Sequence, residues 1–247
     1  MNLLLCYPRS GSTFTRYIIE ALTGVGSLGP PYSRSVVDLP LLHPRKTVAS
    51  PVSVIRIHRE DTKSRQVASL VEKKGFPLIL LIRDPIESIC RHRGTITAQT
   101  VVNYPYTEIC PTVSYFLDNL EFYENYPHKK MVIYYEDLVL NPRKYVSKLA
   151  QFLEIEDVEN KVNHFMAEYE THKSSGLNMY NSTQAGTLTR GNDPNKNLHL
   201  VHGSQTQGNV TKKHSLELSS EFKRVFWKNF TSILTPQASK LIEHYIE

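Results

Sequence analysis

Short apolar runs alternate with segments of helical spacing through the first 150 residues of the chain. Four runs have the length and the leucine- or β-branched character of buried strands, at residues 3–7, 52–57, 77–82 and 130–135. Segments whose apolar residues recur every three or four positions lie at residues 12–22, 61–73, 85–95, 107–125 and 141–153. Nearly continuous apolar strands separated by helices indicate a parallel sheet covered on both faces. The pattern predicts an α/β fold, a three-layer α/β/α domain with a central parallel sheet and right-handed crossovers.

The second half of the chain differs in composition and apolar periodicity. Residues 174–213 are rich in Gly, Asn, Ser and Thr and show little apolar periodicity. A loop of this length inside a compact domain is usually functional or disordered. Two closing helices are predicted at residues 216–230 and 236–246, and Phe222, Val225, Phe226 and Phe230 share one face. We therefore expect one domain over residues 1–247, with residues 174–213 as a lid-like segment.

Composition narrows the class of protein. The net charge of +5 is modest and the basic residues form no block, so no nucleic-acid partner is expected. The three cysteines contain no CxxC pair, which argues against a disulfide framework or a zinc site and for a reducing compartment. No apolar run approaches the about 18 residues of a membrane span. Since Asn2 leads straight into a strand pattern, we expect a cytoplasmic protein; the sequence gives no oligomeric state.

The turn after the first strand, Pro-Arg-Ser-Gly-Ser-Thr, has the composition of an anion site. A helix N-terminus directly after a strand presents free backbone N–H groups at the positive end of the helix dipole. Gly11 allows close backbone approach, Arg9 adds a fixed charge, and nearby hydroxyls add donors. The bound group would be a phosphate or another tetrahedral oxyanion, and the alternative is an ordinary turn with a capping serine. The loop lacks the lysine and the second glycine of GxxxxGK[ST], and the arginine of a cysteine-phosphatase loop would fall at Ser12.

Three stretches together resemble the sulfotransferase family, whose donor is 3′-phosphoadenosine 5′-phosphosulfate (PAPS). They are YPRSGSTF (7–14), IRDP (82–85) and YYEDLVLNP (134–142), and each follows a predicted strand in the family's order. The resemblance covers roughly the first 150 residues. It implies a P-loop-like nucleotide-binding fold, no metal, and transfer of a sulfuryl group to the hydroxyl of a small-molecule or glycan acceptor. Alternatives are a P-loop kinase-like protein and a non-catalytic nucleotide-binding relative.

The same resemblance assigns cofactor contacts. The 5′-phosphosulfate would be held by Arg9, Ser10, Gly11, Ser12, Thr13 and Phe14, with Phe14 stacking on the adenine or packing in the core. The 3′-phosphate would be held by Arg83, whose alternative role is a salt bridge with Asp84 or Glu87. Where the family usually has a serine this chain has Arg91, so either Arg91 or Ser88 would complete that contact. Tyr135 would reach the adenine or fill the sheet, and Arg190 and Gly191 faintly resemble the family's C-terminal R-K-G motif.

His58 is the predicted catalytic base. It follows the second strand, at the position where many members of the family carry the histidine that deprotonates the acceptor, and an imidazole titrates near neutral pH. Arg56 replaces the family's lysine and would neutralise the sulfuryl oxygens, or pair with an acidic side chain. Arg9, where the family's cytosolic members usually have lysine, would stabilise the charge on the leaving group. Residues 24–51 and 95–108 would line the acceptor pocket.

Overall fold

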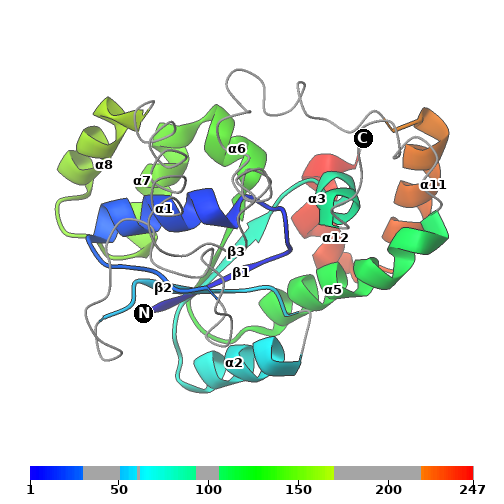
Figure 1. Cartoon of the computed structure of the whole chain (residues 1–247), viewed down its shortest axis with the longest axis horizontal. Helices are drawn as coiled ribbons and strands as arrows, with labels where there is room; N and C mark the ends of the chain where they lie inside the picture. Colours follow the sequence, from blue (N-terminus) through cyan, green and yellow to red (C-terminus); the bar gives the residue numbers. More distant parts are fainter. Residues whose placement is uncertain (30–50, 60–61, 93–105, 170–217, 247) are drawn as a thin grey trace, which may run out of the picture. The chain divides into compact units, whose positions relative to one another are not determined.

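The structure is a computed structural model that describes residues 1–29, 51–59, 62–92, 106–169 and 218–246 (Figure 1). Within these residues four strands form one sheet: β1 (Asn2–Cys6), β2 (Val54–Ile57), β3 (Leu78–Ile82) and β4 (Lys130–Tyr134), in the order β2-β1-β3-β4. β3 pairs in parallel with both β1 and β4, and all five of its residues are buried. The predicted α/β class with a parallel sheet is confirmed.

The strand register sets where the chain leaves the sheet. Cys6 lies opposite Leu81, and Ile82 lies opposite Tyr134. Since these residues end or nearly end their strands, the loop after β1, Arg83 and Tyr135 all begin at the same carboxyl edge. In open α/β sheets this edge is the usual place for ligands.

The contacts of the chain group into two compact units. Unit 1 comprises Met1–Asn2, Ser12–Arg56 and Glu136–His214, and unit 2 comprises Leu3–Gly11, Ile57–Tyr135 and Ser215–Glu247. The prediction of a single domain over the whole chain stays a prediction. The predicted lid at residues 174–213 lies outside the described residues.

Unit 1 holds three helices that pack on one another. These are α1 (Ser12–Thr23), α7 (Pro142–Phe152) and α8 (Val158–Ala167), and the pairwise contacts α1–α7, α1–α8 and α7–α8 are all present (Figure 1). The apolar stripe of α7 is buried, including Val146 and Leu149. In α1 and α7 the helical spacing of apolar residues therefore has the role that the sequence predicted, which is to bury one face of the helix.

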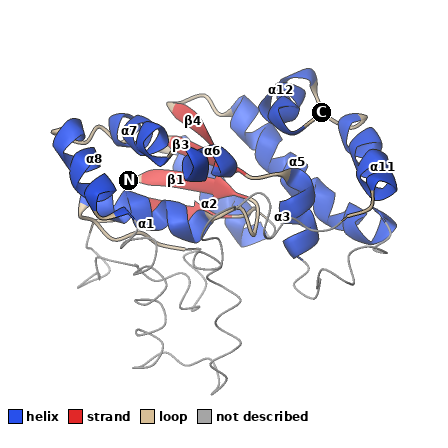
Figure 2. Cartoon of the chain, turned by 90° about the horizontal axis from the view of Figure 1, so that it is seen from above, coloured by secondary structure: helices blue, strands red, loops and turns tan. Residues whose placement is uncertain are grey.

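Unit 2 is organised around the long helix α5 (Tyr106–Asn125). It contacts α3 (Pro85–His92), α11 (Ser220–Thr231) and α12 (Pro236–Ile242), while α2 (Thr62–Lys73) and the short 3₁₀ helix η3 (Glu243–Tyr245) complete the unit (Figure 2). The ring of Phe116 meets that of Phe230 edge-on at 5.8 Å. Phe226 and Phe230 are fully buried, as the predicted apolar face of α11 requires.

Two helices were not predicted from the sequence. α6 (Tyr135–Leu140) contains the Y-E-D-L motif, so this motif opens a helical turn immediately after β4. α8 follows Asp157, which has a left-handed backbone (φ 53°), and buries only Val162 and Phe165. Its apolar residues Val158, Val162, Phe165 and Met166 recur at helical spacing, so this helix was missed although its pattern was present in the sequence. No helix in the described parts of the chain has the length and apolarity needed to cross a membrane.

Candidate functional site

The loop Tyr7–Gly11 joins β1 to α1 in an unusual backbone conformation. Arg9 (φ 68°) and Gly11 (φ 87°) are both left-handed, and the N–H of Ser10 donates to the carbonyl of Tyr7 at 3.3 Å. A left-handed arginine costs of order 1–3 kcal/mol and persists only where the surroundings hold it. Arg83 does so, because its Nη1 donates to the carbonyl oxygen of Arg9 at 3.1 Å. Left-handed residues in such a turn help to point successive N–H groups into one concavity, which suits an anion.

Gly11 is required for a second reason. A Cβ atom at this position would overlap the ring of Tyr135, the first residue after β4. The loop and Tyr135 are therefore in direct backbone-to-ring contact, and any side chain at position 11 would separate them. The positive φ and the close approach both select glycine here.

Ser10 lies between the two left-handed residues and is fully buried. Its hydroxyl finds no hydrogen-bond partner among the described residues. A buried hydroxyl without a partner is costly, and a ligand oxygen would satisfy it. Ser12, which begins α1, is also buried, so the loop delivers the chain directly into the helix N-terminus.

Arg83 connects the loop to Tyr135. Its guanidinium lies 5.0 Å from the centroid of the Tyr135 ring, and its side chain is only 12% exposed. Its Nη2 lies 3.8 Å from Glu87 Oε2, so the predicted salt bridge exists at the outer limit of contact. Asp84 has a different role: its Oδ1 accepts the N–H of Ile86 at 2.8 Å and caps α3. The arginine is held in place by the loop and the ring more than by its acidic neighbours.

The two residues proposed to complete the 3′-phosphate contact differ in their surroundings. Ser88 is fully buried, and its hydroxyl donates to the carbonyl of Pro85 at 3.3 Å within α3. Arg91 lies three residues later in the same helix, and its side chain lies outside the described atoms. The Ser88 hydroxyl is therefore bonded within its own helix.

His58 follows β2 and is oriented by the end of β1. Its Nδ1 lies 2.8 Å from the carbonyl oxygen of Cys6 and 3.4 Å from the Cys6 sulfur, which itself donates to the carbonyl of Ile57. A carbonyl only accepts, so Nδ1 carries the proton. In the neutral ring the lone pair then lies on Nε2, and a general base acts through such a nitrogen. Sequence reasoning found His58 but not the Cys6 carbonyl, because a backbone contact between distant residues has no sequence signal.

The predicted site residues are divided between the two units. Arg9, Ser10, Gly11, His58, Arg83 and Tyr135 lie in unit 2, whereas Ser12, Thr13, Phe14 and Arg56 lie in unit 1. Phe14 meets the ring of Tyr169 edge-on at 6.3 Å. Arg56 is 8% exposed. Arg190 and Gly191 lie outside the described residues.

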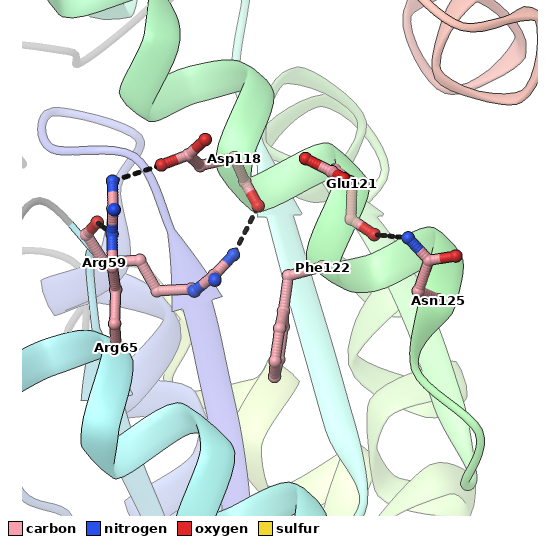
Figure 3. Close-up of a pocket in the computed structure, with 6 residues that line it drawn as sticks. All are labelled: Arg59, Arg65, Asp118, Glu121, Phe122 and Asn125. Carbon is pink, nitrogen blue, oxygen red and sulfur yellow. Dashed lines mark hydrogen bonds and ion pairs between the residues drawn. The ribbon is translucent and has the colours of Figure 1, made fainter.

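A separate pocket in unit 2 has a volume of about 260 Å³ (Figure 3). Its lining carries two arginines, two carboxylates, a ring and an amide, contributed by Arg59, Arg65, Asp118, Glu121, Phe122 and Asn125. None of the predicted cofactor residues lines it. Opposite charges in its walls give it no preference for an anion such as a nucleotide.

Comparisons with known proteins bear on this arrangement. A family model described as "Sulfotransferase domain" matches residues 2–226. Among solved structures, the crystal structure of mouse sulfotransferase SULT7A1 complexed with PAP matches with a TM-score of 0.59 at 14% identity. That match covers 99% of this chain and 87% of the mouse chain, and it shows a shared fold. A comparison with curated proteins gives no significant match.

Proposed function

Because the chain belongs to the sulfotransferase family, we propose that it moves a sulfuryl group from PAPS to a hydroxyl of a small-molecule or glycan acceptor, with His58 as the base. One observation carries the assignment of the site. Arg83 of the second family motif donates to the carbonyl of Arg9 in the first, so the two motifs meet at the carboxyl edge of the sheet. Two motifs 74 residues apart in sequence thus form one basic site.

The residues at this edge fit a 3′,5′-bisphosphate. Arg83 offers a planar fork of donors, the left-handed loop offers backbone N–H groups, and the buried Ser10 hydroxyl needs a partner. The PAP in the mouse neighbour supports the same choice of ligand for this fold. We therefore propose that Arg9, Ser10 and Gly11 bind the 5′ end, and that Arg83, together with Arg91 or Ser88, binds the 3′-phosphate beside Tyr135.

When bound, PAPS supplies the sulfuryl group and the phosphate that leaves. His58 Nε2 accepts the proton of the acceptor hydroxyl, because Nδ1 is committed to the Cys6 carbonyl. Arg9 and the loop N–H groups are proposed to stabilise the negative charge that develops on the leaving phosphate. Arg56 adds a further positive charge two residues before the base. We also propose a cytoplasmic location, because the three cysteines of the sequence contain no CxxC pair.

Thermal unfolding in the presence of PAP tests the donor site. A ligand that binds only the native state stabilises it by about 2.7 kcal/mol at a hundredfold excess over its Kd. We expect such a shift with PAP, independent of magnesium, and its loss in Arg83→Ala. Arg224→Ala is the matched control, since Arg224 is exposed and pairs only on the surface with Glu221. A shift with ATP and magnesium alone would instead identify a kinase-like site.

Transfer is measured with radiolabelled PAPS and a panel of phenols, sugars and lipid alcohols. Labelled product with one class of acceptor, formed without metal, is the expected result. Binding of PAP without transfer to any acceptor, together with indifference to His58→Ala, would point to the non-catalytic relative.

A further inference from the structure

The residue after His58 is fixed to α5. Arg59 has a left-handed backbone (φ 52°), and its guanidinium lies 4.4 Å from the centroid of the Phe122 ring. Its Nη1 donates to the backbone carbonyl of Asp118, one turn before Phe122 on the same helix. Figure 3 shows the Arg59 side chain reaching across to α5 between these two residues. The side chain therefore has two contacts on one rigid helix.

The backbone of Arg59 is held as well. Arg65 Nε donates to the carbonyl of Arg59 at 3.3 Å, and Arg65 Nη2 pairs with the carboxylate of Asp118. The backbone carbonyl of Asp118 thus accepts a hydrogen bond from Arg59, and its carboxylate pairs with Arg65 (Figure 3). We call Arg59, Arg65, Asp118 and Phe122 the α5 anchor. It fixes both ends of a residue whose backbone conformation is otherwise disfavoured for arginine.

The contact with Phe122 is a cation–π contact. Arg59 Nε is buried and has no hydrogen-bond partner among the described residues. Burial lowers the pKa of Arg59, an effect that the nearby Asp118 opposes. A guanidinium remains charged under these conditions and lies flat on a ring, whereas an ammonium presents a point charge without a plane. The anchor therefore needs arginine together with an aromatic ring.

We propose that the α5 anchor makes Arg59 a positioning residue for His58. The left-handed turn at Arg59 fixes the direction in which the chain leaves His58, and so helps to hold His58 Nδ1 on the Cys6 carbonyl. Without the anchor, an arginine or alanine returns to a right-handed or extended backbone, and the imidazole turns away from that carbonyl. The catalytic meaning of the anchor rests on the proposed function, since it assumes that His58 is the base. The effect of the anchor on the orientation of the His58 ring does not depend on the proposed function.

Two kinds of variant separate this role from general stability. Arg59→Ala and Phe122→Leu remove the guanidinium or the ring, whereas Phe122→Tyr keeps the stacking. Arg59→Lys keeps the charge and loses the plane. The first readout is ¹⁵N NMR of the neutral His58 ring in the full chain, because Nδ1-protonated and Nε2-protonated imidazoles have distinct spectra. The second is kcat and KM with PAPS, and the third is binding of PAP.

We expect the Nδ1-protonated form of His58 in the native protein and in Phe122→Tyr. In Arg59→Ala, Arg59→Lys and Phe122→Leu we expect a mixture with the Nε2-protonated form. A displacement of this kind costs about 10²-fold in kcat, while PAP binding stays as in the native protein. The double variant Arg59→Ala/Phe122→Leu should lose no more kcat than Arg59→Ala alone, because both substitutions disrupt the same α5 anchor.

An unchanged Nδ1-protonated ring in folded Arg59→Ala and Phe122→Leu would overturn the proposal, whatever the activity. So would a loss of kcat that follows a loss of thermal stability in every variant, Phe122→Tyr included. His58→Ala separates the two hypotheses. If it retains full transfer activity, the base assignment fails, and the NMR result still decides whether the α5 anchor orients the ring.

Discussion

At the scale of single residues, several positions in and next to the site have an unusual backbone conformation. Arg9, Gly11 and Arg59 all have positive φ, and two of the three are arginines. Each of these arginines is held by a contact from elsewhere in the fold: Arg83 reaches the carbonyl of Arg9, and Arg65 reaches that of Arg59. Strain of this sort clusters at functional sites, where the surrounding structure over-determines it.

Gly11→Ala tests the close approach of the loop to Tyr135. The Cβ would overlap the Tyr135 ring on a backbone with φ 87°, so we expect a loss of about 1–3 kcal/mol in unfolding free energy together with the loss of PAP binding. The matched control is Gly24→Ala, where φ is 67° and nothing lies within 4 Å of the new Cβ. It should cost about 1 kcal/mol and leave PAP binding intact. Urea unfolding measures the stability of both variants, and a thermal shift with PAP measures their binding. Equal losses of stability and of PAP binding in the two variants would contradict the role of Tyr135.

At the scale of elements, α1 is tied to the chain that follows it by a buried polar network. Arg16 Nε donates to Ser27 Oγ at 2.8 Å, and Ser27 donates its N–H and its hydroxyl to Glu20 Oε1. All three residues are fully buried. Next to them, Leu28 forms a parallel bridge with Ile55 of β2. The network therefore fixes the return of the chain after α1.

Glu20→Gln tests this network. Removing the carboxylate charge while the guanidinium of Arg16 stays buried should lower the unfolding free energy by about 3–5 kcal/mol. The control is Glu221→Gln, which breaks an exposed pair with Arg224 and should change stability by no more than about 0.5 kcal/mol. Urea unfolding gives both numbers. A Glu20→Gln variant as stable as the control would show that the network contributes nothing.

The element predictions differ in accuracy. β3 was predicted at residues 77–82 and is Leu78–Ile82, because a run buried on both faces is apolar throughout. α11 was predicted from residue 216 but begins at Ser220, after Ser219 accepts the N–H of Phe222 as its cap. α8 was missed although Val158, Val162 and Phe165 have helical spacing. A strand buried on both faces is therefore readable from its sequence, whereas the start of a helix depends on its capping residue.

At the scale of the whole molecule, buried tyrosines in both units limit stability at high pH. Burial, followed by the charge of Glu168, raises the pKa of Tyr17 in unit 1 to about 12. Burial, followed by the charge of Glu72, does the same for Tyr126 in unit 2. Tyr126 also donates its hydroxyl to the carbonyl of Phe76. In the unfolded chain a tyrosine titrates near pH 10.

A raised pKa means that the folded state favours the neutral phenol. Its contribution to stability is complete below about pH 10 and is lost as pH rises towards 12. We therefore expect the urea midpoint to fall over this interval, and to fall less steeply in Tyr17→Phe and Tyr126→Phe. Absorbance of the ionised phenol, recorded in the same samples, reports the titration. A midpoint that is constant from pH 10 to 12 would exclude this linkage.

The sequence alone determined the fold class and, through its three motifs, the sulfotransferase family. It also determined the positions of the turn after β1, Arg83 and His58, since each follows a strongly apolar strand. Only the tertiary structure decided how those residues act: that Arg83 holds the carbonyl of Arg9, that Tyr135 covers Gly11, and that Cys6 fixes the proton on His58 Nδ1. The α5 anchor of Arg59 belongs to the same group. The physical reason is that strand and helix patterns are local properties of the chain, whereas these contacts join backbone atoms and rings about 50 or more residues apart, whose meeting depends on strand order and register.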